Sequence, residues 1–392
     1  MRIAYVDPGL SGPLGHNAAM VEEFDASLVR EYGHVVSYAV GASVDARDFP
    51  HLSGRLVPAF RIDGYARPGP SDLHDPTRLS RIIETIATDL QSSAVLDDCD
   101  AVLMPTAYPF HVRALALLAP RLRGRRVVIG LLLPARYWTP GGTPAADVAD
   151  LFGVGLHLLG KEAELFLYNE TGTFELRDSV LSLPRLLPPF GTTSAKRVRE
   201  LAARSLTGDR TQAPSLGFFG SPFGSKGFGM LASAVERVAQ AGGEPRTRLV
   251  VRLPQGHEAI CKRLQEMAPW VDARSERTSN EAYLAEMAAV DAVWAFYDPA
   301  EYGDKMSGIV PEALSLSKPL LIADGCRGIE DFLEWQAPGS FMCGAYDERT
   351  VVDVLSLPAP AWSRASSCAR EHAPLIAQLK SMPRYLAVCG LI

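Results

Sequence analysis

The stretch Tyr297–Ala323, YDPAEYGDKMSGIVPEALSLSKPLLIA, determines how the fold of this 392-residue chain is interpreted. It predicts a polar loop, a Ser307–Gly308 turn, a helix that opens with Pro311–Glu312 and the apolar strand Pro319–Ile322. Proline suits the first helical turn, where its missing N–H is not needed. A glycine-containing loop entering a helix leaves backbone N–H groups free, which together with the helix dipole make an anion site. A carboxylate beside that site can bind ribose hydroxyls, so the stretch matches what a nucleotide-sugar requires.

The same stretch resembles the donor-binding signature of retaining glycosyltransferases of family 4, which have the GT-B architecture. In that signature two Glu residues with seven residues between them are followed by Ala, a small-residue helix and a Gly-x-Pro strand entry. Glu312 matches the second Glu, and Ala313 and Pro319 follow in register. Ser317 stands where the Gly of the strand entry would be. Asp304 occupies the position of the first Glu, with a side chain one methylene shorter.

A bacterial branch of that family, in which Y-x-x-(R/K)-x-S-G precedes the Glu, is also similar. Tyr302, Lys305, Ser307 and Gly308 carry this pattern. The resemblance implies that these four residues and Ile309 bind the donor, and that Asp304 approaches the donor sugar. The alternative for this segment is an ordinary loop-to-helix connection of an α/β protein.

A second segment, Phe218–Phe228, places a glycine-rich loop between a strand that ends at Gly220 and a helix preceded by Lys226. Glycines let the backbone approach a phosphate, and the ammonium supplies charge to a leaving pyrophosphate. The segment resembles the family's strand-G-R-…-K-G loop, and Lys226 matches its Lys. Ser221 and Pro222 occupy the stretch where the family carries an Arg; Arg252 and Lys305 are the candidates to replace it. A strand-turn-helix with a surface lysine is the alternative.

A third glycine-rich segment, Gly9–Asn17, follows the first strand. Two residues separate each of its glycines from the next, and no acidic residue ends the second strand, so a nicotinamide-binding loop is disfavoured. It resembles the GT-B loop that approaches the donor diphosphate and the acceptor, with Gly12, Gly15 and His16 as candidates. His16 is expected to be a hydrogen-bond partner at the acceptor site; the alternative is a solvated loop histidine beside an ordinary N-cap, Asn17.

His111 follows a predicted strand, at the edge of a parallel sheet where α/β proteins bind ligands. Members of the family use a histidine of the N-terminal domain near the reacting centre, so His111 is a candidate; a capping or packing histidine is the alternative. The predicted catalytic residues are therefore Lys226, Asp304, His16 and His111.

Composition excludes several classes of protein. The net charge of −6 argues against a nucleic-acid binder, which should show a basic excess. Lys and Arg gather at 121–126 and 195–199; these clusters are either solvated helix surfaces or contacts for anionic lipid or an anionic acceptor. Six scattered cysteines without a C-x-x-C pair argue against a zinc site and fit a reducing compartment. Without a signal peptide or an apolar span, the expected location is the cytoplasm, with peripheral membrane contact left open.

Strands and helices alternate along the chain, which favours parallel sheets covered by helices, and the alternation restarts after 214. The prediction is a GT-B fold of two Rossmann-like domains facing a cleft. The boundaries are 1–190 for the N-terminal acceptor domain, 191–213 for a linker, 214–370 for the donor domain and 371–392 for a C-terminal helix. The sequence predicts this helix at about 369–389 with a kink at Pro383, and the resemblance implies that it returns to the N-terminal domain.

The predicted function is a hexosyltransferase-type reaction from a nucleotide-sugar, with retention, to an unidentified acceptor. Lys226 and the N–H groups near Gly308–Ile309 are expected to stabilise the departing diphosphate. No D-x-D motif lies near the donor segments and GT-B enzymes generally need no metal, so neither a metal nor a further cofactor is expected. Alternatives are a catalytically weak GT-B protein that binds a nucleotide-sugar or a protein partner, and a nucleotide-sugar 2-epimerase. The oligomeric state stays open.

Overall fold

The computed structural model describes residues 1–13, 16–62, 75–132, 146–176, 179–190, 192–207, 213–242, 244–276 and 278–392. The side chains of His16 and of residues 146–150, 192–194 and 205–207 lie outside this description. The chain divides into two compact units. Unit 1 comprises Met1–Thr192 and Ser381–Ile392, and unit 2 comprises Thr193–Lys380.

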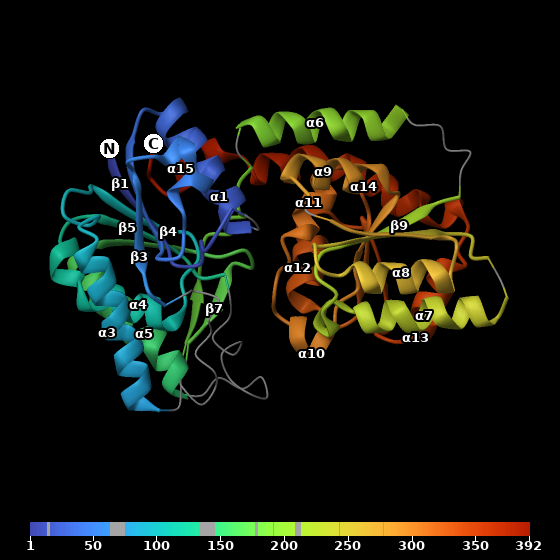
Figure 1. The fold of residues 1–392 in the computed structure, drawn as a ribbon, viewed down its shortest axis with the longest axis horizontal. Coiled ribbons are helices and arrows are strands. Elements are labelled where there is room, and N and C mark those ends of the chain that lie inside the picture. The colour runs from blue at the N-terminus through green and yellow to red at the C-terminus, as the bar shows by residue number, and fades with distance from the viewer. Residues whose placement is uncertain are drawn as a thin grey trace. The chain divides into compact units, whose positions relative to one another are not determined.

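Unit 1 is built on a six-stranded parallel sheet with the order β3-β2-β1-β4-β5-β6 (Figure 1). The strands are β1 (Arg2–Asp7), β2 (Val35–Gly41), β3 (Leu56–Phe60), β4 (Ala101–Met104), β5 (Arg126–Gly130) and β6 (Glu164–Tyr168). The helices are α1 (His16–Asp25), the π-helical η1 (Ala26–Glu31), α3 (Pro76–Ser92), α4 (Pro109–Leu117), α5 (Ala146–Glu162) and α15 (Met382–Val388). Three short 3₁₀ turns, η2 (Ala46–Asp48), η3 (Pro50–Leu52) and η4 (Ala119–Leu122), and the hairpin β7 (Thr173–Glu175) and β8 (Val180–Ser182) complete it.

The central strands are continuous apolar runs because helices cover both faces of the sheet. All four residues of β4 are buried, for example, as are the last five of β1. Alternate residues feed two cores: Ala4 and Val102 pack with α3, α4 and α5, whereas Tyr5 and Leu103 pack with α1 and α15. The end of the chain is thus part of the core of unit 1.

Unit 2 repeats the same topology, with the order β11-β10-β9-β12-β13-β14. The strands are β9 (Ser215–Phe219), β10 (Arg248–Leu253), β11 (Val271–Ser275), β12 (Ala292–Ala295), β13 (Leu320–Ala323) and β14 (Phe341–Gly344). The helices are α6 (Thr192–Thr207), η7 (Gly224–Lys226), α7 (Phe228–Gln240), α8 (Glu258–Met267), α9 (Asn280–Ala289), α10 (Pro299–Tyr302), α11 (Ile309–Ser315), α12 (Arg327–Gln336), α13 (Glu348–Leu355), η8 (Ala359–Trp362) and α14 (Ser363–Leu379). In Figure 1, α7 and α8 lie on one face of the sheet and α9, α11 and α14 on the other.

Two boundaries differ from the sequence prediction. The polar helix expected as part of the linker, α6, belongs to unit 2 except for its first residue, and its Val198 and Leu201 are buried. The single helix expected at 369–389 is two helices, α14 and α15. Pro374 is accommodated inside α14, whereas Pro383 lies in the first turn of α15, where a proline needs no N–H partner. The chain therefore passes from unit 2 to unit 1 at Lys380–Ser381.

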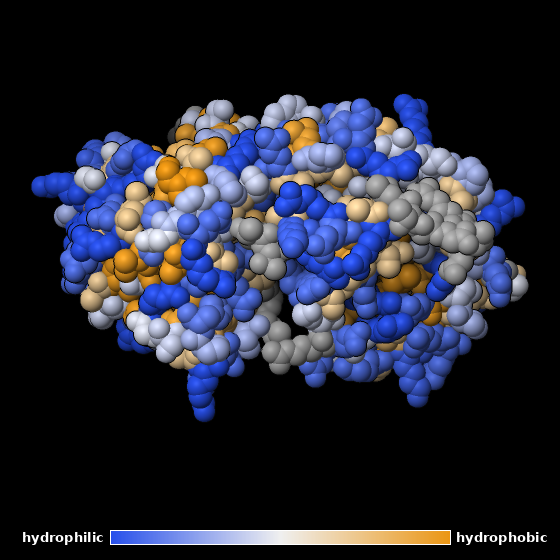
Figure 2. All heavy atoms as spheres, turned by 90° about the horizontal axis from the view of Figure 1, so that it is seen from above, coloured by the Kyte–Doolittle hydropathy of each residue, from blue (hydrophilic) through white to orange (hydrophobic). Residues whose placement is uncertain are grey.

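No helix among the described residues combines the length and apolarity that crossing a membrane requires. The face shown in Figure 2 is mostly hydrophilic, with smaller apolar areas between charged side chains.

Candidate functional site

The strand order of unit 2 identifies where a ligand has room to bind. From β9 the chain adds β10 and β11 on one side, and it then crosses to the other side to add β12, β13 and β14. The loops that follow β9 and β12 therefore diverge at the carboxyl ends of two adjacent strands, and such a switch point is the usual ligand site of open α/β sheets. Both donor segments singled out in the sequence, at 218–228 and 297–312, lie in these connections.

Hydrogen bonds and a close backbone contact join these two loops to each other. The N–H of Asp298 donates to the Ser225 carbonyl at 3.0 Å, and the indole Nε1–H of Trp294 donates to the Lys226 carbonyl at 2.9 Å. Gly227 has a φ of +71°, and a Cβ added there would lie 2.1 Å from the Phe296 carbonyl oxygen. Only glycine permits both this conformation and this approach, so the sequence fixes the loop of Lys226 against the end of β12.

Glu312 is half-buried on α11, four residues into the segment that follows Gly308. The Tyr283 hydroxyl donates to its Oε2 at 3.0 Å. Burial raises the pKa of Glu312, whereas the charge of Lys380, the hydrogen bond from Tyr283 and the charge of Lys226 act in the opposite direction. Glu312 is therefore a carboxylate whose ionised form is supported by two ammonium groups and one hydroxyl.

Lys226 stands at the end of the loop that follows β9 and is half-buried. Burial lowers the pKa of this lysine, and the nearby charge of Glu312 raises it. A Cβ added to Gly220 would lie 3.2 Å from the Lys226 Nζ, so the ammonium lies against the glycine that directly follows β9. The structure thus brings together Lys226 and Glu312, the two residues on which the sequence argument rests most, and places Gly220 beside Lys226.

The remaining residues of the donor pattern form a polar and aromatic cluster in the connection from β12 to α11. The rings of Tyr297 and Tyr302 lie 4.4 Å apart, and the Lys305 Nζ lies 5.5 Å from the centre of the Tyr302 ring. The hydroxyls of Tyr297 and Ser307 are hydrogen-bonded at 3.2 Å. These contacts hold the chain that leads into α11, which begins at the buried Ile309 after the exposed Gly308 and has seven residues.

Asp304 lies at the base of the same connection. Its Oδ1 is 3.3 Å from the Nη2 of Arg327, the first residue of α12, and Gly328 N–H donates to the Gly303 carbonyl at 3.0 Å. The shorter carboxylate thus has a cationic partner within its own unit. Its contact with a donor sugar remains a prediction.

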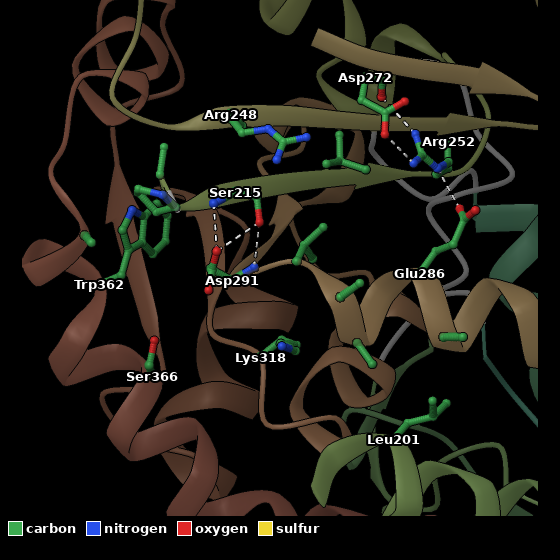
Figure 3. A pocket seen from close by; sticks show the side chains of 18 of the residues that line it. Leu201, Ser215, Arg248, Arg252, Asp272, Glu286, Asp291, Lys318, Trp362 and Ser366 are labelled. Atoms are coloured by element: carbon green, nitrogen blue, oxygen red, sulfur yellow. Dashed lines mark hydrogen bonds and ion pairs between the residues drawn. The ribbon is translucent and has the colours of Figure 1, made fainter. Parts of the chain in front are cut away.

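Arg252 does not take the place of the arginine that the loop after β9 lacks. Its guanidinium donates to Glu286 at 2.7 Å and to Asp272 at 2.8 Å, and it also donates to the carbonyls of Val251 and Asp272 (Figure 3). The guanidinium is thus bound by two carboxylates from neighbouring elements. The sequence of β10 alone could not predict these partners. This arrangement does not support Arg252 as a pyrophosphate ligand.

The side chain of Arg252 instead lines a cavity of about 570 Å³ (Figure 3). Ser215 and Arg248, the first residues of β9 and β10, also line it, as does Lys318 just before β13. Because the strands are parallel, these positions mark the amino-terminal edge of the sheet. The cavity therefore starts at the edge opposite the one that carries Lys226 and Glu312, and it extends along the sheet to Arg252, the fifth of the six residues of β10.

The corresponding switch point of unit 1 lies between β1 and β4. The buried polar groups there form hydrogen bonds with nearby backbone and side-chain donors. Asp7, at the end of β1, is 4% exposed, and its Oδ1 accepts hydrogen bonds from Gly9 N–H at 3.0 Å and Asn17 Nδ2–H at 2.7 Å. Burial raises the pKa of Asp7 to about 6. Gly12 has open space around it, whereas Gly15 and the His16 side chain lie outside the described residues. Sequence reasoning missed Asp7, although an aspartate directly after a strand and before a glycine-rich loop could have indicated it.

His111 is a packing residue in this structure. It is 2% exposed at the start of α4, its Nδ1 accepts a hydrogen bond from Tyr108 N–H at 3.3 Å, and its ring stacks on the Tyr108 ring at 5.1 Å. Burial lowers its pKa to about 3, so the imidazole is neutral near pH 7. Its Nε2 is buried and finds no hydrogen-bond partner among the described residues. The capping alternative therefore describes His111, and the predicted catalytic role is not supported.

One group of potential metal ligands occurs among the described residues, at Asp324, Glu330 and Cys343. Its members already bond within unit 2: the Cys343 thiol donates to Asp324 at 2.7 Å, and Gly325 N–H donates to Glu330 at 2.6 Å. Asp324 follows β13, Glu330 lies in α12 and Cys343 lies in β14, and the group includes none of the predicted site residues.

Comparison with known proteins supports the architecture. No protein-family model and no curated protein sequence matches the chain. Among solved structures, sucrose-phosphate synthase from Thermosynechococcus elongatus is similar at 13% identity and a TM-score of 0.61, with 99% of each chain covered. The UDP-forming α,α-trehalose-phosphate synthase from Burkholderia xenovorans has 13% identity and a TM-score of 0.62 over 100% of each chain. WaaG, a glycosyltransferase of lipopolysaccharide biosynthesis, has 16% identity and a TM-score of 0.58 over 98% of each chain. The predicted GT-B fold of two Rossmann-like units is confirmed.

Proposed function

We propose that this protein is a retaining glycosyltransferase of the hexosyltransferase type, which uses a nucleotide-sugar donor bound at the switch point of unit 2. The observation that carries the proposal is the juxtaposition of Lys226 and Glu312 at the carboxyl ends of β9 and β12. A cation suited to a diphosphate and a carboxylate suited to ribose hydroxyls stand together where the fold opens. The similar solved structures, two synthases and one glycosyltransferase, support the same proposal.

The two side chains have separate roles in this proposal. Glu312 accepts a hydrogen bond from the ribose, which orients the nucleotide. Lys226 offsets the negative charge that grows on the diphosphate as the bond from the anomeric carbon to the phosphate oxygen breaks. The acceptor hydroxyl then bonds through its oxygen to the same face of the sugar and gives its proton to the departing phosphate oxygen. This course follows because the family resemblance implies retention and the sequence offers no obvious protein nucleophile. Burial of the ammonium strengthens its effect, since fewer waters screen it.

Release of nucleoside diphosphate from a panel of UDP-, GDP-, ADP- and dTDP-sugars tests the proposal. We expect one nucleotide class to be turned over, slowly with water and faster once an acceptor is supplied, and Lys226→Ala to abolish most of that turnover. Absence of turnover with every donor, in samples that bind a nucleotide, would instead select the catalytically weak alternative. Two observations favour this catalytically weak alternative. Asp304 pairs with Arg327, and Ser221–Pro222 stands where the family carries an arginine.

The acceptor is proposed by analogy only, as a growing polysaccharide or a lipid-linked glycan handled at the cytoplasmic face of a membrane. Addition of such acceptors to the same assay identifies the class that accelerates release of the diphosphate.

A further inference from the structure

The sequence assigned no role to Tyr283, yet this residue touches the carboxylate at the centre of the site. It lies on α9, 29 positions before Glu312, and its hydroxyl donates to the Glu312 Oε2 at 3.0 Å. Its ring packs edge-to-face on Phe219, the last residue of β9, with the ring centres 5.9 Å apart and an angle of 84°. The start of α9 is fixed by Ser279, whose Oγ accepts from Ala282 N–H at 3.2 Å. Helix and ring together therefore hold the hydroxyl in one place.

The groups around Glu312 come from four elements. Lys226 follows β9, Tyr283 comes from α9, Tyr297 follows β12, and Lys380, which is 3% exposed, ends α14. The hydrogen bond from Tyr283 occupies Oε2, and no described residue donates to Oε1. A carboxylate held through one oxygen presents the other in a defined direction.

We propose that Tyr283 is a positioning residue for the donor: its hydroxyl holds Oε2 of Glu312, so that Oε1 accepts a hydrogen bond from a ribose hydroxyl of a nucleoside diphosphate. This inference rests on the proposed function and adds to it the residue that orients the ribose acceptor. Tyr283 also favours the ionised form of the half-buried carboxylate, because a hydrogen bond to the charged form opposes the effect of burial on the pKa of Glu312.

The test is Tyr283→Phe, which removes the hydroxyl and keeps the ring on Phe219. Titration calorimetry with UDP, GDP and ADP gives the Kd of wild type and variant between pH 5.5 and 8.5. We expect about 10-fold weaker binding of the nucleotide that binds wild type. The loss should grow as the pH falls, because without the hydrogen bond the pKa of Glu312 moves further up. The phosphate groups of the nucleotide also titrate in this range, but they affect both proteins alike. Their contribution therefore cancels in the ratio of the two Kd values at each pH. In turnover, KM for the donor should rise by the same factor with kcat unchanged.

Two controls separate positioning from general damage. Tyr32→Phe removes a tyrosine hydroxyl of unit 1 just before β2, at the amino-terminal edge of that unit's own sheet. It should leave the Kd for the nucleotide unchanged. In a Glu312→Gln background, Tyr283→Phe should have much less effect, since the charged partner is gone; this cycle remains informative even if the single variant loses stability.

The outcomes are distinguishable. Equal binding by wild type and Tyr283→Phe, with weak binding by Glu312→Gln, overturns the role of Tyr283 and leaves the proposed function standing. A loss that is independent of pH, or additive with Glu312→Gln, also overturns it, because packing alone would explain such a loss. Failure of folded wild type to bind any of the three nucleotides overturns the proposed function and this inference together.

Discussion

The two units share one topology and use the same edge differently. In each, the first strand of the unit lies in the middle of a six-stranded parallel sheet, and the chain crosses over it to reach the strand on its other side. At that edge of unit 1, Asp7 and His111 are buried and bond to nearby backbone or side-chain donors. At that edge of unit 2, Lys226 and Glu312 are half-buried and lie within each other's electrostatic reach.

The difference shows that topology decides where a sheet opens and that individual side chains decide what the opening can bind. The Asp7 carboxylate accepts hydrogen bonds from Gly9 N–H and Asn17, so it stabilises the loop that follows it. A carboxylate with one hydroxyl partner, between two lysines, is suited to a ligand. The predictions that follow examine whether unit 2 carries the donor chemistry that the described part of unit 1 does not show.

The largest effect is expected from Lys226→Ala. Removing one preorganised electrostatic donor typically lowers kcat by about 100- to 1000-fold. Initial rates of diphosphate release measure it, with Lys262→Ala as the control, because Lys262 is an exposed lysine on α8. Equal rates for Lys226→Ala and wild type would remove this residue from the mechanism.

The next largest effect is expected on stability, from replacing a glycine in the loop after the first strand of each unit. Gly227→Ala combines a φ of +71° with a Cβ 2.1 Å from the Phe296 carbonyl, so we expect unfolding to become easier by about 2–4 kcal/mol. Gly12→Ala in the corresponding loop of unit 1 meets nothing within 4 Å and should change stability little. Chemical denaturation of both variants makes the comparison, and similar losses for both would contradict the tight contact between the loops of unit 2.

Asp7 predicts a pH dependence of stability in unit 1. Its pKa is about 6 in the folded protein against an ordinary 3.8, so the folded state holds its proton more tightly than the unfolded state. The stability that this proton provides is complete below about pH 4 and is lost as the pH rises through 6. Asp7→Asn cannot ionise, so its advantage over wild type should grow across that window to about 1–3 kcal/mol.

Denaturation midpoints of wild type and Asp7→Asn at pH 4, 5, 6 and 7 measure this difference. A difference that stays constant with pH would show that Asp7 does not titrate as described. Nucleotide affinity should be the same for both proteins, because the account assigns Asp7 to the loop of unit 1 and not to the donor.

The smallest effect is expected from metal removal. EDTA should leave turnover of the nucleotide-sugar within about twofold, because Lys226 is proposed to offset the diphosphate charge and no metal is needed for that. Loss of turnover in EDTA with recovery on addition of Mg²⁺ would assign that charge compensation to a metal.

Local sequence patterns predicted the architecture, and they singled out Lys226 and Glu312 as candidates, because both inferences depend on neighbouring residues. The strand-loop-helix pattern around Lys226 and the loop before Glu312 are each contained in about a dozen positions. Parallel order then brings their loops to one edge without further information. The alternation of strands and helices likewise predicted two α/β units, and the comparisons confirm the fold.

Features that depend on distant partners could not be predicted in this way. Arg252 is held by Asp272 and Glu286, which are 20 and 34 positions away, and Tyr283 reaches Glu312 across 29 positions. His111 follows a strand at the correct edge, but the rotation of α4 turns it into the core. Periodicity also does not distinguish a helix kinked at Pro383 from a second helix that starts beside it.

The most direct test of the account is titration calorimetry of UDP, GDP and ADP with wild type, Glu312→Gln and His111→Phe. The account predicts that one nucleotide binds wild type, that Glu312→Gln binds it about 10- to 100-fold more weakly, and that His111→Phe binds it as wild type does. Unchanged affinity in Glu312→Gln, or no nucleotide binding by folded wild type, would contradict the assignment of the donor site to unit 2.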